Sequence, residues 1–143
     1  MTDTSKAPIW FWVTAVIALL WNGLGLFAYL QQIMMSAEQF AALPEAQQDL
    51  LATQPSWVMA AFAIAVFAGF LAAILLLMRK RIAVRLFLLS LLAVVVQFSS
   101  YFIIDGYWEF ISGRGWMMPA LIVIFAIGFA WMAWHEEQAG LLR

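Results

Sequence analysis

The chain has 143 residues, of which 66% are hydrophobic and 10% charged, and its formal net charge is −1 at pH 7. Soluble domains are about 45–50% apolar and about 25% charged, so lipid must be the solvent for much of this protein's surface. The sequence contains no cysteine, which excludes disulfides, thiol catalysis and cysteine-ligated clusters.

Four uncharged apolar segments carry the excess of hydrophobic residues. Each is close to the ~20 residues with which a helix crosses a ~30 Å hydrocarbon core. The sequence therefore predicts an all-α, polytopic membrane protein with one four-helix domain over residues 1–143. The four spans are expected at about 9–30, 57–78, 86–104 and 116–134.

The first predicted span contains a polar residue, Asn22, that lies at about the same depth as Gln97 of the third span. At a rise of ~1.5 Å per residue, each lies about 18–20 Å from the Lys/Arg side of the membrane. Polar groups at such depth need a partner or a water-lined cavity. We expect either a hydrogen bond between these two spans or a solute-binding site, in which Trp21 and Tyr101 would take part.

Trp21 itself has two expected roles beside Asn22. It either fills a gap in the core or forms an apolar platform next to a polar group, and core packing is the simpler expectation.

The connection after the first span predicts one or two short helices at the outer membrane interface. Ser36 and Gln39 have the spacing of a capping box, and Pro44 suits a first helical turn. Pro55 then ends this region before the second span.

A strip of small residues recurs every fourth position in the second span, at Ala61, Ala65, Gly69 and Ala73. Such a strip lets another helix backbone approach closely. Packing within the chain and self-association of two chains are both consistent with it. Leu75, in the leucine run of this span, is expected to face lipid.

The turn between the second and third spans carries four cations, Arg79, Lys80, Arg81 and Arg85. Lys and Arg of short loops remain on the cytoplasmic side of a membrane. This turn therefore predicts that both termini are cytoplasmic. Lys6 and Arg143 fall on the same side, whereas Arg114 and the acidic residues Glu38, Glu45, Asp49, Asp105 and Glu109 fall on the other.

The last connection and the end of the fourth span carry the remaining polar residues. The aromatic residues Tyr107, Trp108 and Phe110 are expected to dip into the outer interface. His135 lies at the cytoplasmic end of the fourth span, beside Glu136 and Glu137, and is expected to be solvated. No nucleophile–base pair or cluster of metal ligands is visible. We therefore expect neither an enzyme nor a metal site or cofactor, and no nucleic-acid partner.

Three stretches resemble a known family. They are Trp21-Asn22-Gly23-Leu24-Gly25 with Tyr29, the Pro55-Ser56-Trp57 opening of the second span, and the basic turn leading to Ser90. They are similar to small four-span proteins of the bacterial inner membrane that are commonly catalogued as sugar transporters. The resemblance implies a multi-pass protein of that membrane with a role in transport.

Two hypotheses follow for the function. In the first, an oligomer forms a pathway for a small neutral polar solute such as a sugar, using Asn22, Gln97, Trp21 and Tyr101. In the second, the chain is a non-catalytic accessory or structural subunit that packs against a larger membrane complex through its small-residue strip and aromatic faces. The lipid bilayer is a partner in both.

Overall fold

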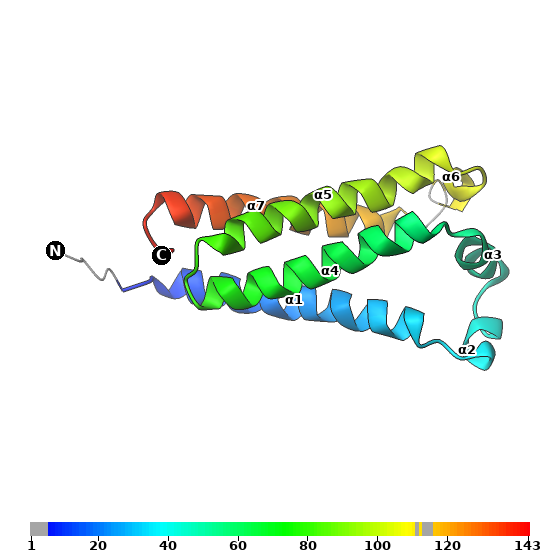
Figure 1. Cartoon of the computed structure of the whole chain (residues 1–143), viewed down its shortest axis with the longest axis horizontal. Helices are drawn as coiled ribbons and strands as arrows, with labels where there is room; N and C mark the ends of the chain where they lie inside the picture. Colours follow the sequence, from blue (N-terminus) through cyan, green and yellow to red (C-terminus); the bar gives the residue numbers. More distant parts are fainter. Residues whose placement is uncertain (1–5, 111, 113–115) are drawn as a thin grey trace.

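The structure is a computed structural model that describes residues 6–110, 112 and 116–143. Four long helices run side by side (Figure 1), and each is long and apolar enough to cross a membrane. The described part of the chain contains no strand. The all-α fold class and the four spans predicted from the sequence are confirmed. The long helices are α1 (Ile9–Ile33), α4 (Ser56–Leu77), α5 (Ile82–Ile103) and α7 (Met117–Gln138).

Two of these helices extend beyond the predicted spans because they continue through charged residues. α5 begins at Ile82 rather than near residue 86, so Arg85 lies in its first turn, and α7 continues past residue 134 to Gln138. A charged residue ends the stretch that hydrocarbon tolerates, but it does not interrupt the i to i−4 hydrogen bonds of a helix.

Two short helices, α2 (Ala37–Ala41) and α3 (Glu45–Thr53), occupy the connection between α1 and α4. The predicted capping box opens α2: the Ser36 hydroxyl accepts from the Gln39 N–H at 3.2 Å, and the Gln39 side chain accepts from the Ser36 N–H at 3.0 Å. Prolines at 44 and 55 immediately precede α3 and α4, where their missing N–H costs no helical hydrogen bond.

The hairpin of α4 and α5 is the centre of the molecule, with α1 packed on α4 and α7 packed on α5. α4 is the most buried of the four helices and α1 the least. The small-residue strip makes this arrangement possible, since Ala61, Ala65, Gly69 and Ala73 are all buried.

The strip is buried by packing within the chain, as the first of its two expected roles requires. Leu75 was also expected on the lipid surface, but it packs against the main hydrophobic core. It lies one residue before Leu76, the most buried leucine of α4.

The turn between α4 and α5 is stabilised by a left-handed residue and by residues 141–143. Arg79 has φ +57°, and the N–H groups of Arg79 and Lys80 donate to carbonyls of the last turn of α4 at 2.9 Å. This pattern satisfies carbonyls that a helix end leaves unpaired.

Residues 141–143 fold back over this turn and close one end of the bundle. Gly140, with φ +75°, reverses the chain after α7. The Arg143 N–H then donates to the Arg79 carbonyl at 2.6 Å, and the Arg81 N–H donates to the Arg143 carbonyl at 2.9 Å. Leu142 is only 1% exposed, so this segment is part of the core.

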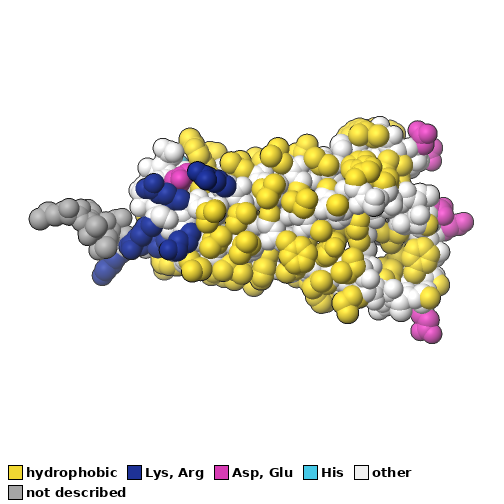
Figure 2. Space-filling model, viewed as in Figure 1, with side chains coloured by type: hydrophobic (Ala, Val, Ile, Leu, Met, Phe, Trp, Pro, Cys, Tyr) yellow, Lys and Arg dark blue, Asp and Glu magenta, His cyan; other side chains and the backbone are white. Residues whose placement is uncertain are grey.

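Charges of opposite sign gather at the two ends of the molecule (Figure 2). We call these the basic end and the acidic end. Arg114, predicted on the acidic side, lies outside the described residues. The basic end carries Lys6, Arg79, Lys80, Arg81, Arg85 and Arg143, and the acidic end carries Glu38, Glu45, Asp49, Asp105 and Glu109.

Candidate functional site

A cavity of about 950 Å³ lies in the half of the molecule nearer the acidic end. All four long helices line it, and α3 covers its outer mouth. The four residues predicted for a solute site, Trp21, Asn22, Gln97 and Tyr101, all line this one cavity. The helix order therefore brings together residues that lie up to 80 positions apart in the chain.

A series of aromatic contacts forms the floor of the cavity. The rings of Trp21 and Phe125 stack with centroids 4.2 Å apart, Phe125 lies 5.6 Å from Phe129, and Phe129 lies 6.0 Å from Phe87. Beyond these rings, toward the basic end, the main core is closely packed with alanines from all four helices. The cavity is thus closed toward the basic end.

This stacking also defines the position of Trp21. Phe125 packs against the indole, as core packing requires, and Trp21 also lines the cavity beside Asn22, as a platform next to a polar group requires.

Asn22 packs against α4 instead of bonding to α5. Its amide donates to the Ala18 carbonyl of its own helix at 2.8 Å, and its side-chain oxygen lies directly against Gly69. Among the described residues it makes no hydrogen bond to Gln97, so the expected bond between the first and third spans is wrong. The physical reason is the small-residue strip, because it draws α1 onto α4 at the depth of Asn22.

Ser90 of α5 reaches the same point from the other side. Its hydroxyl donates to the Ala65 carbonyl of α4 at 2.7 Å and lies next to Gly69. Three helices therefore meet at one glycine, with a polar side chain of α1 on one side and of α5 on the other.

Gln97 and Tyr101 are the polar groups that remain available inside the cavity. They lie one helical turn apart on α5, and both are half-buried. In the described part of the chain, neither the Gln97 carboxamide nor the Tyr101 hydroxyl forms a hydrogen bond. Half-buried polar groups without partners are the groups with which a protein orients a bound molecule.

The mouth of the cavity is built from glutamines and leucines. Gln31 and Gln32 of the last turn of α1 line it, together with Gln47 of α3. A residue far along the chain holds α3 in place: the Tyr107 hydroxyl donates to the Leu50 carbonyl at 2.8 Å.

The short helix α6 (Tyr107–Phe110) supplies this anchor. Tyr107 is only 4% exposed, so it does not dip into the interface as predicted. Its hydroxyl points inward because it bonds to the Leu50 carbonyl. Trp108 is 55% exposed, as an interfacial residue should be.

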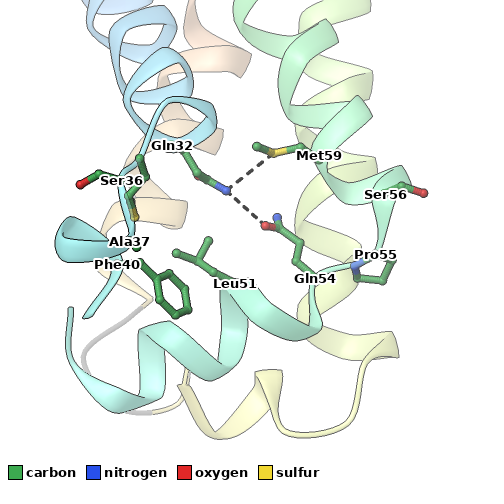
Figure 3. A pocket seen from close by; sticks show the side chains of 10 residues that line it. Gln32, Ser36, Ala37, Phe40, Leu51, Gln54, Pro55, Ser56 and Met59 are labelled. Carbon is green, nitrogen blue, oxygen red and sulfur yellow. Dashed lines mark hydrogen bonds between the residues drawn. The ribbon is translucent and has the colours of Figure 1, made fainter. Parts of the chain in front are cut away.

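A smaller cavity of about 460 Å³ adjoins the mouth between the end of α1 and the start of α4 (Figure 3). The Gln32 amide spans it, donating to the Gln54 side-chain oxygen at 3.2 Å and to the Met59 sulfur at 3.6 Å. Gln32, Met35 and Leu51 line both cavities. The two spaces therefore form one region at the acidic end.

No charged residue lines either cavity within the described residues. The same part of the chain holds no group of three or more His, Asp or Glu side chains that could bind a metal ion. What the lining offers is apolar surface, carboxamides and hydroxyls.

One buried ionisable residue was missed by the sequence analysis. Glu136 has no exposed surface. The Thr14 hydroxyl of α1 is a polar group near its carboxyl, but that hydroxyl donates to carbonyls of its own helix, and the carboxyl oxygens form no well-aligned hydrogen bond in the described part of the chain. The helical spacing offers the signal: Glu136 follows Ala133 by three residues and Phe129 by seven, so it shares their buried face. His135, the preceding residue, is exposed, and its ring stacks on Trp131 with centroids 5.5 Å apart.

Comparison of the chain with protein-family models, with curated proteins and with solved structures gives no match.

Proposed function

We propose that this chain is a multi-pass protein of the bacterial inner membrane that binds a small neutral solute from the outer side, in the manner of a transporter. The observation that carries the proposal is the convergence of Trp21, Asn22, Gln97 and Tyr101 on one uncharged cavity near the acidic end.

The charge distribution supports the orientation in this proposal. The basic end would lie in the cytoplasm together with both termini, because short loops rich in Lys and Arg are retained there. The acidic end, with the mouth of the cavity, would then face outward.

The chemistry of the lining supports a neutral solute with an apolar part. A charged ligand would leave water without gaining an opposite charge, at a cost of several kcal/mol. Gln97 and Tyr101 supply donors and acceptors for a few polar groups, while most of the lining is aliphatic or aromatic. A free sugar of the kind implied by the family resemblance would use the polar groups but leave most of the apolar wall unmatched.

Transport would require the basic end to open, because the aromatic floor and residues 141–143 close it. Four helices enclose little space of their own, so we propose that an oligomer provides the pathway.

The accessory-subunit hypothesis is the alternative. Of its two predicted contacts, the small-residue strip is used within the chain. The aromatic faces remain exposed, for example at Phe67, Phe102 and Trp131, so a partner complex would bind there.

The test is solute binding to the purified full chain with Gln97→Leu beside Val96→Leu. Gln97 lines the cavity, whereas Val96 is 49% exposed on the outer surface of the same helix. Gln97→Leu should weaken the binding of a neutral hydroxylated solute about tenfold, equivalent to one hydrogen bond of ~1.5 kcal/mol, and Val96→Leu should not. The binding measurement is combined with native mass determination in mild detergent. Co-purification of the chain with a larger complex, without bound solute, would favour the accessory-subunit hypothesis.

A further inference from the structure

We infer that the cavity takes a neutral amphiphile with a single hydrocarbon chain, which enters sideways from the outer leaflet between α1 and α7. The inference rests on the proposed function, namely that the cavity binds a neutral molecule, and it adds the class of that molecule and its route of entry.

The route follows from how α1 and α7 are placed. Each packs on the central hairpin, and the Trp21–Phe125 ring stack joins them at mid-depth. Nearer the acidic end, both helices line the cavity, and several of the lining side chains are also largely exposed: Leu24 is 64% and Met118 is 60% exposed. A residue that both lines a cavity and faces outward marks the place where the cavity reaches the surface. That surface is the apolar belt of the protein, where hydrocarbon rather than water is the solvent.

The depth of the cavity matches one leaflet. Ten residues separate Gln31 at the mouth from Trp21 at the floor, which at a rise of ~1.5 Å per residue is about 15 Å. The hydrocarbon core of a bilayer is ~30 Å thick, so one leaflet contributes about 15 Å. A chain whose polar group stays at the interface would therefore end at the aromatic floor.

The mouth defines the polar group of the amphiphile. The exposed carboxamides of Gln31 and Gln47 stand there, and each offers two donors and an acceptor. Glu45 and Asp49 lie two residues before and after Gln47 on α3, on the opposite face of that helix, and together with the other acidic residues of this end they give it a negative potential that disfavours an anionic headgroup. A hydroxylated, uncharged headgroup fits both observations.

The size of the cavity agrees with this class of ligand. A volume of about 950 Å³ lies at the upper end of the ~300–1,000 Å³ typical of small-molecule sites, which leaves room for a chain as well as a headgroup.

The experiment uses the full chain in phosphatidylcholine nanodiscs with a monoacylglycerol that carries a photoreactive diazirine in its chain. After irradiation, labelled peptides are located by mass spectrometry. Ala28→Trp places a large ring at the cavity wall, and Ala60→Trp, on an exposed position of α4 that does not line the cavity, is the matched control. Thermal melting of both variants verifies that they remain folded.

Labels should concentrate on residues 21–28 and 117–122, fall about tenfold in Ala28→Trp, and persist in Ala60→Trp. Unlabelled monoacylglycerol should compete, and a fatty acid of the same chain length should compete about tenfold less because of the acidic mouth. Labels spread evenly over all exposed helix faces, unaffected by Ala28→Trp, would overturn the inference. If Ala28→Trp unfolds the chain, the inference is tested in the wild type by comparing how well the monoacylglycerol and the fatty acid compete with the photoreactive lipid.

A second readout separates this inference from the proposed function. The chain has no cysteine, so Ile122→Cys places a single thiol on the cavity wall. Protection of this thiol by a water-soluble neutral solute such as glucose, without site-specific lipid labelling, would refute the amphiphile and retain the proposed function. Absence of both protection and site-specific labelling would refute both.

Discussion

Among the described glycines, Gly69 has the least room for a side chain. A methyl group there would overlap the side-chain oxygen of Asn22 and press on the Ser90 hydroxyl, both of which belong to other helices. We predict that Gly69→Ala destabilises the protein by about 1–3 kcal/mol, as overpacking typically does. Thermal unfolding in detergent, followed by circular dichroism, measures the loss.

Gly128→Ala is the matched control, because a methyl group at that exposed position of α7 would meet nothing within 4 Å. It should be neutral, or stabilising by up to ~1 kcal/mol through helix propensity. Equal stability of both alanine variants would show that α1 and α5 do not converge on Gly69.

Glu136 supplies the second prediction at this scale. A buried polar group without a hydrogen bond costs about 1–3 kcal/mol, and more when it is charged. Replacement by an apolar residue of similar length, Glu136→Met, should therefore raise the unfolding temperature, whereas Glu137→Met, on a half-buried neighbour, should change stability by less than about 0.5 kcal/mol. A lower unfolding temperature for Glu136→Met would mean that the carboxyl has a stabilising partner.

At the scale of elements, residues 141–143 contribute to the stability of the fold although they follow the last helix. Leu142 is only 1% exposed and belongs to the main core. Leu142→Ala should cost about 2–5 kcal/mol, in the range of buried leucines. Leu88→Ala, on the 47% exposed face of α5, removes the same atoms from a surface position and should cost much less. Chemical unfolding of both variants gives the comparison, and equal losses would contradict a packed tail.

The sequence was sufficient to predict the elements and part of the site. Hydrophobic length located the four spans, and the Ser36–Gln39 spacing located α2, because both depend on local chemistry alone. Depth along each helix also brought Asn22 and Gln97 to the same level. Their predicted bond was wrong because depth says nothing of rotation about the helix axis. The closest contact of α1 is set by Gly69, and that contact is visible only in three dimensions.

Glu136 and Leu142 escaped prediction for a related reason. Both follow the apolar stretch of the fourth span and read as solvated sequence, yet the reversal at Gly140 folds residues 141–143 back over the end of the bundle. The burial of Leu142 depends on a contact with the α4–α5 turn some 60 residues earlier, which no local pattern records, whereas for Glu136 the spacing from Ala133 and Phe129 is a local signal.

At the scale of the whole molecule, the separation of charge predicts how the chain lies in a membrane. Lys80→Cys, in the turn of the basic end, should be protected from a membrane-impermeant thiol reagent in intact spheroplasts, and Gln47→Cys, on α3, should react. Permeabilised cells are the control, in which both should react. The opposite pattern would reverse the orientation. The same charge rule predicts that Thr2 faces inward and Gly113 outward, and both lie outside the described residues.

The central hairpin has a consequence for how the protein assembles. α4 and α5 are joined by a turn of a few residues, so their contact closes the smallest loop and costs the least chain entropy. α1 and α7 each dock on this hairpin, which gives each of them its own binding surface. We therefore expect the hairpin to form first and the outer helices to join it in either order. A substitution that weakens the α1–α4 contact would then leave a three-helix intermediate in the membrane. Its small-residue strip would be exposed to helices of other membrane proteins.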